Sequence, residues 1–355
     1  MKILRLTTLL DFGGQEKQYL SFTEQPELLK HHYVFAAIGF GGNAEETLRK
    51  RGFEVHILNQ PFSIKNLSNI WKVYQLIKKL KPDIVHTAAA EANFHGIIAA
   101  KLAGVTTIIG EEIGIPNHSS IAQKVFRCVY RLANQVIGVS QSVKNHLVNT
   151  GEIPESKGKV IYNPVSIPTP FPKKESPNFE IVYVGRLEIV KNVETLIKAF
   201  ANSNHTHAHL TIVGDGRERH HLEALTSTLQ MESKITFTGF TSEPSKYLCN
   251  ADLFVLPSFS EGFGIAAAEA MFLKIPVLCS RVGGIPEFVK DGENGWLFDP
   301  KNTAELTVKL NQIIAMDAES LKMMGSKGYD KVINEFKVEN YIENLERFYH
   351  QLHHD

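Results

Sequence analysis

Short runs of apolar and β-branched residues alternate with helix-length segments along most of this chain, and this alternation constrains the fold more than any other feature. In the first half the expected strands cover residues 3–6, 33–38, 53–58, 83–86, 106–109 and 136–139. A repeated strand–helix–strand order favours parallel strands, because each helix carries the chain back across the sheet and covers one of its faces. We therefore predict an α/β fold built on a doubly wound parallel sheet.

A proline-rich segment interrupts this pattern near the middle of the chain. Residues 163–178 contain five prolines, and the alternation then resumes with expected strands at 181–184, 210–213, 235–237, 253–256 and 277–279. The length of 355 residues also exceeds the roughly 250–300 at which one hydrophobic core stops growing. We predict Rossmann-like domains at 1–165 and 179–337, joined by a linker at 166–178, with a ligand in the cleft between them.

The last residues, 338–355, form a separate amphipathic element. Apolar side chains recur there at a spacing typical of one helix face, at Val338, Tyr341, Ile342, Leu345, Phe348 and Leu352. Such a stripe must pack on another surface. We expect this C-terminal helix to pack back on the N-terminal domain.

The net charge of the chain is zero, but the two halves differ. Residues 1–168 carry 19 Lys and Arg against 13 Asp and Glu, and residues 169–355 carry 19 against 25. The basic half suggests contact with an anionic partner such as a phospholipid headgroup or a phosphate-linked acceptor, although a solvated surface explains the asymmetry equally well. Nucleic-acid binding is disfavoured, because no basic stripe interleaved with aromatic residues occurs.

The sequence shows no targeting signal that would direct it out of the cytoplasm. It contains no run of about 18 apolar residues, and its N-terminus leads directly into a strand rather than into a signal peptide. We therefore expect a cytoplasmic protein. Basic amphipathic stretches at 71–81 and around Lys124, Arg127 and Arg131 leave open a peripheral contact with the inner face of an anionic membrane. Helices packed on their own sheet would account for the same pattern.

The segment 257–269 has the composition of an anion-binding turn. An expected strand leads into a glycine-containing turn that opens a helix, so the free backbone N–H groups of residues 263–265 can bind a diphosphate. Glu261 precedes this helix and Glu269 lies inside it. The two carboxylates can therefore reach different parts of one ligand.

Two cations, Arg186 and Lys191, follow the first expected strand of the second domain. Cations at the carboxyl end of a strand suit phosphate oxygens, the Arg as a planar fork and the Lys as a point charge. A surface ion pair with Glu188 or Glu194 is the alternative. Together with the anion-binding turn, the two cations indicate neutralisation of a diphosphate.

These motifs resemble those of the family 4 retaining glycosyltransferases, which have the GT-B fold of two Rossmann-like domains facing across a cleft. The most specific element is the E-x7-E pair formed by Glu261 and Glu269 in a Pro-Ser…Glu-Gly-Phe-Gly setting. Further shared positions are the early Gly13 and Gly14 and, after a later strand, Gly214. The resemblance covers essentially the whole chain.

The resemblance implies a role for each matching position. Arg186 and Lys191 would bind the diphosphate, and together with Glu261 they would form the catalytic group. Glu261 would contact the transferred sugar and Glu269 the ribose. The other implied donor-binding positions are Gly13, Gly14, Gly214, Phe240, Thr241, Gly262, Phe263, Gly264 and Ile265.

The resemblance also implies a reaction. A sugar would pass from a nucleotide-diphosphate donor, with UDP favoured over GDP, to a saccharide or lipid-linked precursor of a polysaccharide, with retention of the anomeric configuration. Positive groups around the leaving diphosphate would stabilise its developing charge, so neither a metal nor another cofactor is expected. The sequence agrees, because it contains no Asp-x-Asp motif.

The acceptor side is assigned to four residues of the first domain, namely His86, His95, Glu111 and Glu112. The two histidines flank the junction of an expected strand and helix, where hydrogen-bonded structural histidines are also common. Many relatives carry a His after the strand at 106–109, whereas this chain has the two glutamates there. This departure leaves the identity of the acceptor open.

Two other functions fit the same motifs. A sugar-nucleotide epimerase could use the same fold and donor, since a fold does not fix a reaction. A protein that binds a nucleotide sugar without catalysis could retain the same binding residues. A Rossmann dehydrogenase is disfavoured, because no G-x-G-x-x-G motif follows the first strand.

Overall fold

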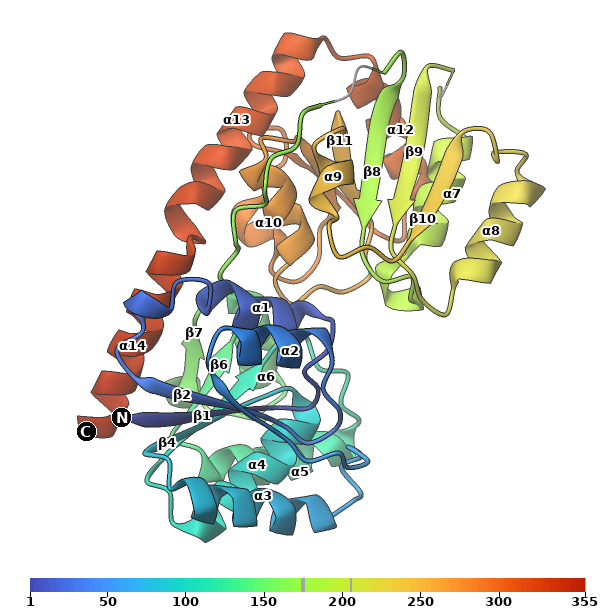
Figure 1. The fold of residues 1–355 in the computed structure, drawn as a ribbon. Helices are drawn as coiled ribbons and strands as arrows, with labels where there is room; N and C mark the ends of the chain where they lie inside the picture. The colour runs from blue at the N-terminus through green and yellow to red at the C-terminus, as the bar shows by residue number, and fades with distance from the viewer. Residues whose placement is uncertain (174–175, 205, 355) are drawn as a thin grey trace. The chain divides into compact units, whose positions relative to one another are not determined.

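The computed structural model describes residues 1–173, 176–204 and 206–354. The chain divides into two compact units, one formed by Met1–Val165 with Val338–Asp355 and the other by Ser166–Lys337. Each unit is built on its own parallel sheet with helices packed against it (Figure 1). The predicted fold class, with two doubly wound Rossmann-like domains, is confirmed.

The sheet of the first unit has the strand order β3-β2-β1-β4-β5-β6-β7, and neighbouring strands are parallel. Its strands are β1 (Lys2–Thr7), β2 (His32–Ala37), β3 (Glu54–Ile57), β4 (Ile84–Ala88), β5 (Thr107–Glu112), β6 (Gln135–Gly138) and β7 (Gly158–Val160). The order reverses between β1 and β4. Doubly wound sheets bind ligands beyond the carboxyl ends of the strands at such a reversal.

Helices cover both faces of this sheet (Figure 1). They are α1 (Gly14–Phe22), α2 (Asn43–Lys50), α3 (Ser68–Leu80), α4 (Ala90–Ala103), α5 (Ser120–Leu132), α6 (Gln141–Asn149) and α14 (Val338–His354), with short 3₁₀ turns at Pro26–Leu28 and Glu155–Lys157. On one face α4 packs against α3 and α5, and on the other α1 packs against α2 and α14. None of the helices in the described residues is both long enough and apolar enough to cross a bilayer.

Local sequence explains where several of these helices begin and end. The Ser140 hydroxyl accepts a hydrogen bond from the Val143 backbone N–H and so caps α6. α4 ends at Gly104 in the left-handed region, with φ 80°, which glycine adopts without strain. α3 ends just before Lys81, because the proline that follows disfavours helical backbone in the preceding residue.

α14 supplies much of the core on one face of the first sheet. Its buried side chains in this cluster are Val338, Tyr341, Ile342, Leu345, Phe348 and Tyr349. They pack with Ile3, Ile84 and Ile109 of the sheet, and with Tyr19 and Phe22 of α1. Each fully buried apolar side chain contributes roughly 1.5–3 kcal/mol. The last helix of the chain is therefore an integral part of the first unit.

The second unit has the strand order β10-β9-β8-β11-β12-β13, which reverses between β8 and β11. Its strands are β8 (Phe179–Val184), β9 (Ala208–Val213), β10 (Ile235–Gly239), β11 (Leu253–Leu256), β12 (Val277–Ser280) and β13 (Trp296–Phe298). Its helices are α7 (Val193–Ala201), α8 (Arg219–Thr228), α9 (Ser245–Leu248), α10 (Ile265–Phe272), α11 (Ile285–Phe288), α12 (Thr303–Ile314) and α13 (Ala318–Glu335), with a 3₁₀ turn at Ile189–Lys191. α7 packs against α8 and α12, and α10 packs against β11, β12 and α13.

The proline-rich segment leads into the second unit. Residues 174 and 175 of the expected linker lie outside the described residues, and its described residues, 166–173 and 176–178, contain neither helix nor strand. The Phe171 backbone N–H donates to Cys249 Sγ at 3.2 Å, and Lys173 Nζ lies 2.5 Å from Asp252. These contacts hold the segment against the second unit.

Two edge strands, β7 and β13, do not emerge from the sequence pattern. Each has three residues, and β7 includes the exposed Lys159. Segments this short carry too little alternation to be recognised by period. Both are positioned by parallel pairing with a neighbouring strand, β6 or β12.

Candidate active site

The strand order of the second unit brings together two loops that are far apart in the sequence. β8 and β11 are neighbours, and the order of the sheet reverses between them. The loop after β8 contains Arg186 and Lys191, and the segment after β11 contains Glu261. Because parallel strands end at the same edge of a sheet, these three residues belong to one site at the strand ends.

Lys191 and Glu261 form an ion pair at this site. Lys191 Nζ lies 2.6 Å from Glu261 Oε1, and side-chain exposures of 19% and 10% leave both within reach of a ligand. The Ser258 hydroxyl donates a hydrogen bond of 2.6 Å to the same carboxylate oxygen. Lys191 is thus paired with Glu261, and not with Glu188 or Glu194. Two of the predicted catalytic residues are therefore in direct contact.

Arg186 has no ion-pair partner among the described residues. Its side chain is exposed, and its backbone carbonyl accepts a hydrogen bond of 2.9 Å from the Tyr183 hydroxyl. This bond holds the backbone of the loop and leaves the guanidinium available to an anion. The planar donors of a guanidinium match the oxygens of a phosphate.

α10 begins without a side-chain cap. Its N-cap residue, Gly264, has φ 101°, and a Cβ at this position would collide with the Ile285 side chain. Only glycine combines this backbone conformation with so close a contact. The first backbone N–H groups of the helix, from Ile265 onward, have no side-chain cap and can bind an anion.

Other predicted residues of this segment differ in what they can offer a ligand. The Phe263 ring is 2% exposed and packs against Phe288 and Phe336, so only its backbone is available. Gly262 and Glu269 are partly buried, and Glu269 lies about one turn inside α10. A carboxylate near a helix start can accept hydrogen bonds from sugar hydroxyl groups, as the resemblance implies.

Gly214 joins the ends of three strands. It has φ 140°, and a Cβ there would collide with the Gly185 carbonyl oxygen. Its backbone N–H donates a hydrogen bond of 3.0 Å to the Gly239 carbonyl. The loops after β8, β9 and β10 therefore approach this closely only because residue 214 is a glycine.

Phe240 and Thr241 directly follow β10, as the sequence predicts. Phe240 is 57% exposed, and an exposed ring can stack on a nucleotide base. The Thr241 hydroxyl accepts a hydrogen bond of 3.1 Å from the Glu243 backbone N–H, which holds the turn in place.

Three polar residues support this site although no sequence pattern singles them out. Asn192 has φ 54°, and its side-chain amide donates hydrogen bonds of 3.0 Å to the carbonyls of Pro257 and Pro300. Ser258 is fully buried, and the Ser280 hydroxyl donates a hydrogen bond of 2.6 Å to its carbonyl. An Asn directly before a helix is a weak signal for left-handed backbone. The serines give no signal, because only the tertiary fold brings their strands together.

In the first unit, the loop after β1 contains Gly13 and Gly14. Gly13 is the N-cap residue of α1 and has extended backbone, φ 166°, which any residue can adopt. A Cβ on Gly13 would meet only the carboxylate end of the Glu16 side chain, which can move aside, so neither backbone conformation nor packing requires a glycine here. α1, like α10, starts without a side-chain cap.

The structure encloses the four predicted acceptor-side residues within the first unit. His86 and His95 are 0% exposed, Glu111 is 1% exposed and Glu112 is 4% exposed. His95 Nε2 lies 3.2 Å from the Ser63 carbonyl oxygen, which is a structural contact. These side chains have almost no solvent contact in this structure. Their assignment to the acceptor stays a prediction.

Glu111 and Glu112 point to opposite faces of β5, because successive side chains of a strand alternate. Burial raises the pKa of Glu111, but the charge of Arg5, 2.9 Å away, acts together with His86 and Gln18 to outweigh it, and the pKa falls to about 2. Glu112 accepts hydrogen bonds from Tyr130 and Asn93, yet burial raises its pKa to about 7. At neutral pH the first carboxyl is an anion, whereas the pKa of the second lies close to neutral pH.

Another polar pair lies where the first sheet reverses its order. The Thr8 hydroxyl donates a hydrogen bond of 3.3 Å to Glu91 Oε2 and joins the loop after β1 to the start of α4.

Ala89, the N-cap residue of α4, has φ 77° and ψ 154°, which is strained for a residue other than glycine. Such strain concentrates at functional sites. The end of β4 is therefore a further candidate ligand position that sequence patterns do not reveal.

Potential metal ligands do not cluster in the described part of the chain. It contains no group of three or more His, Cys, Asp or Glu side chains that could hold a metal ion. That the reaction needs no metal stays a prediction.

The sequence matches two family models that together span most of the chain. The model described as Glycosyltransferase Family 4 matches residues 12–167, and the model described as Glycosyl transferases group 1 matches residues 169–331. Fold and matches together define a two-domain glycosyltransferase. The chain belongs to the family 4 glycosyltransferases, as its motifs predict.

Individual relatives agree with this assignment. The chain is 36% identical to an uncharacterized glycosyltransferase of Methanocaldococcus jannaschii over 51% of its own length and 51% of that protein, so it spans about half of this relative. It is 26% identical to the UDP-Gal:alpha-D-GlcNAc-diphosphoundecaprenol alpha-1,3-galactosyltransferase of Escherichia coli, with coverage of 84% and 83%. The crystal structure of HepE from Anabaena in complex with UDP and glucose matches with a TM-score of 0.87 at 24% identity, over 99% of this chain and 100% of that one. The last similarity shows the fold.

Proposed function

We propose that this protein transfers a sugar from a UDP-sugar to a hydroxyl group of a saccharide or lipid-linked acceptor, with retention of the anomeric configuration. The observation that carries this proposal is the convergence of Arg186, Lys191 and the uncapped start of α10 at the strand ends of the second unit. The Escherichia coli relative is named for a UDP-Gal donor and a diphosphoundecaprenol-linked acceptor, and the HepE structure contains UDP and glucose. These names support the classes of donor and acceptor.

The site is suited to stabilising a leaving group. Breaking a sugar–phosphate bond places negative charge on the departing diphosphate and positive character on the anomeric carbon. Arg186 and the first amides of α10 would bind the diphosphate, without a metal. Because Lys191 and Ser258 already hold Glu261 Oε1, Glu261 would orient the sugar rather than attack it. The leaving phosphate oxygen would then deprotonate the acceptor hydroxyl on the same face, which gives retention.

Donor and metal requirements can be tested together by calorimetry. Titration with UDP-glucose, UDP-galactose, UDP-N-acetylglucosamine and GDP-mannose, each with and without EDTA, should show binding of a UDP-sugar in both conditions. A strict manganese requirement would contradict the metal-independent part of the proposal. Failure of every nucleotide sugar to bind would contradict the proposal as a whole.

Product analysis separates transfer from the two rival functions. Proton NMR of the product should show the anomeric configuration of the donor sugar, and an inverted product would contradict retention. Incubation of the donor without an acceptor should give only slow hydrolysis. An epimerised nucleotide sugar would identify an epimerase, and the absence of any turnover would favour a binding protein.

A peripheral contact with the inner face of an anionic membrane is a further part of the proposal. The exposed side of α5 combines the basic residues Lys124, Arg127 and Arg131 with Ile121, 77% exposed, and Val125, 38% exposed. Interfacial helices present this combination of cationic and apolar side chains. Co-sedimentation with phosphatidylglycerol vesicles should exceed that with phosphatidylcholine vesicles and should fall in Ile121→Glu. Equal binding to both vesicles would contradict the contact.

A further inference from the structure

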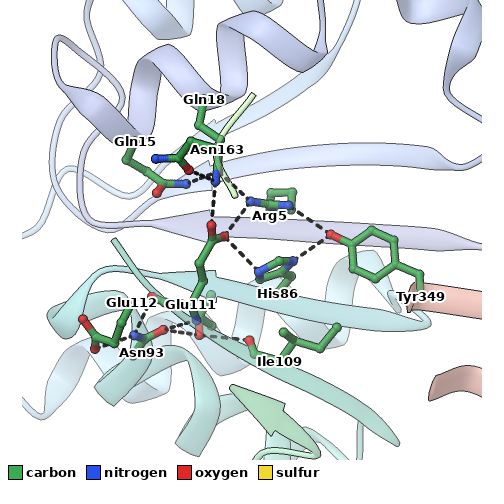
Figure 2. A network of polar contacts seen from close by, with 11 residues as sticks. Arg5, Gln15, Gln18, His86, Asn93, Ile109, Glu111, Glu112, Asn163 and Tyr349 are labelled. Carbon is green, nitrogen blue, oxygen red and sulfur yellow. Dashed lines mark hydrogen bonds and ion pairs between the residues drawn. The ribbon is translucent and has the colours of Figure 1, made fainter. Parts of the chain in front are cut away.

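A charged pair is buried among apolar residues in the core of the first unit (Figure 2). Arg5 lies on the face of β1 that carries Ile3, and Glu111 lies on the face of β5 that carries Ile109. Arg5 Nη2 is 2.9 Å from Glu111 Oε2, and the side chains are 0% and 2% exposed. Taking such a pair out of water costs several kcal/mol per ion, and apolar residues of similar volume often give equal or greater stability. Stability alone therefore gives no reason for charges at this position.

Gln18 of α1 connects this pair to its surroundings (Figure 2). Its Oε1 accepts hydrogen bonds from Arg5 Nη2 at 3.1 Å and from Gln15 Nε2 at 2.8 Å. Its Nε2 donates to Glu111 Oε1 at 2.6 Å and to Asn163 Oδ1 at 2.8 Å. A primary amide has two acceptor sites and two N–H donors. The hydrogen-bonding capacity of Gln18 is therefore fully used.

The charged pair also fixes which way the Gln18 amide points. In the observed orientation its carbonyl oxygen faces the Arg5 cation and its NH₂ group faces the Glu111 anion. A flipped amide would place donors against the guanidinium and an acceptor against the carboxylate. Both contacts would be repulsive in a buried environment of low dielectric constant.

A histidine and a tyrosine lie beside the charged pair. Tyr349 Oη accepts a hydrogen bond from Arg5 Nη1 at 3.0 Å and lies 2.7 Å from His86 Nδ1. Burial, followed by the charge of Arg5, lowers the pKa of His86 to about 4. Nε2 of the neutral ring lies 3.0 Å from Glu111 Oε2, without the geometry of a hydrogen bond.

The network around Gln18 meets three parts of the unit, two through Gln18 itself and the third, α14, through the hydrogen bond from Arg5 to Tyr349. α1 starts at Gly14 without a side-chain cap, and Gln18 lies one turn farther along it. Asn163 lies two residues before the first unit ends at Val165. Tyr349 lies on α14, where the chain has returned to this unit. The network thus ties the start of α1 to the segments through which the chain leaves and re-enters the unit.

We propose that Gln18, held in orientation by Arg5 and Glu111, is a positioning residue that fixes the uncapped start of α1 before a ligand binds. This inference rests on the proposed function and on the donor-binding role that the family resemblance implies for Gly13 and Gly14. A helix start that is already ordered offers its backbone N–H groups at no further entropic cost, which favours the bound state. The charges remain in the core because they determine one orientation of the amide.

The variant that tests this is Gln18→Met, which is close in length and removes the four hydrogen bonds while retaining the charged pair. The matched control is Glu346→Gln on α14. Glu346 is also buried and accepts hydrogen bonds from the Lys30 backbone N–H at 3.0 Å and the Tyr33 hydroxyl at 3.1 Å, outside the Gln18 network. Three quantities should be measured for each variant: thermal midpoint, hydrogen–deuterium exchange of residues 17–20, whose amides are the first in α1 with helical hydrogen bonds, and kcat and KM for the UDP-sugar.

Gln18→Met should exchange faster at residues 17–20 and lose about tenfold in kcat/KM, the scale of one or two hydrogen bonds. Glu346→Gln should lower the thermal midpoint without either effect. Unchanged exchange at residues 17–20, or an activity loss no greater than in the control at equal stability, would overturn the inference. If Gln18→Met does not fold, Asn163→Ala removes one of the four bonds, and the same exchange measurement applies. The exchange result does not depend on any donor, so it is separable from a failure of the wild-type protein to bind nucleotide sugars.

Discussion

The two units reverse their strand order in the same way, but a charged pair in each differs in how far it is exposed to solvent. In the second unit Arg186 is exposed, and Lys191 and Glu261 retain side-chain exposures of 19% and 10%. In the first unit Arg5 and Glu111 are exposed by only 0% and 2%. The same topology therefore carries accessible charges in one unit and enclosed charges in the other.

This difference separates two uses of an ion pair. Partly exposed charges at strand ends remain hydrated and can exchange water or a protein partner for a phosphate oxygen. Enclosed charges have lost their water and depend on fixed partners, so they define geometry rather than bind a ligand. The charges of the second unit thus have the features of a binding site. The enclosed charges of the first unit instead hold neighbouring side chains in a fixed geometry.

The largest effect is expected when the enclosed pair is broken. Glu111→Gln leaves the Arg5 charge uncompensated, which should cost about 3–5 kcal/mol in the free energy of unfolding. Lys198→Ala breaks the exposed pair with Glu194, whose side chains are 45% and 42% exposed, and should cost at most about 0.5 kcal/mol. Urea unfolding followed by circular dichroism measures both variants. Similar losses in the two would remove the distinction between enclosed and accessible pairs.

On the accessible side, Arg186→Ala should lower kcat by roughly 10²–10³, the effect of losing one positioned transition-state donor. Its thermal midpoint should not change, because the guanidinium has no ion-pair partner in the described residues. Arg347→Ala on α14 removes an exposed arginine paired with Glu343 and serves as the control. Unchanged turnover in Arg186→Ala would remove this residue from the mechanism.

A smaller effect, confined to binding, is expected for Glu269→Ala. Hydrogen bonds to a charged group contribute about 1.5–3 kcal/mol, so the donor Kd should rise roughly tenfold to a hundredfold. A group that binds the ribose contributes equally before and during the reaction, so kcat should change little. Calorimetry and steady-state kinetics separate the two quantities. A fall in kcat without a change in Kd would contradict the assigned role.

The smallest net effect is expected from pH, because two buried groups of the first unit oppose each other. The pKa of His86 is lowered from 6.5 to about 4, so the unfolded chain binds more protons in that window and stability rises with pH. The pKa of Glu112 is raised from 4.5 to about 7, so the folded state binds more protons there and stability falls as pH rises. Between pH 4.5 and 6.5 the contributions of His86 and Glu112 to the pH dependence of stability therefore partly cancel.

Glu112→Gln should therefore reveal the pH dependence of the unfolding free energy that is due to His86. The unfolding free energy of this variant should rise more steeply between pH 4.5 and 6.5 than that of the wild-type protein. Denaturant titrations at several pH values in this window measure the difference. Parallel profiles for the two proteins would show that Glu112 has no shifted pKa in the folded state.

Much of the fold and part of the candidate site are accessible from the sequence. The alternating pattern gives the two parallel sheets, and the Glu-Gly-Phe-Gly turn identifies the start of α10. Arg5 shows where such reasoning stops, because an arginine within an apolar strand gives no sign that it is enclosed. Its partner Glu111 is 106 residues away in the chain, and only the adjacency of β1, β4 and β5 brings the two together.

The local amino-acid sequence was enough to specify the secondary-structure elements, the fold class and the family. Periodicity, turn residues and short motifs depend only on residues that are close together in the sequence. The partner of each charged side chain was decided by the folded sheets. Lys191 meets Glu261, and Arg5 meets Glu111, because distant strands become adjacent. Electrostatic energy depends on distance in space and on loss of water, and neither quantity is encoded by position along the chain.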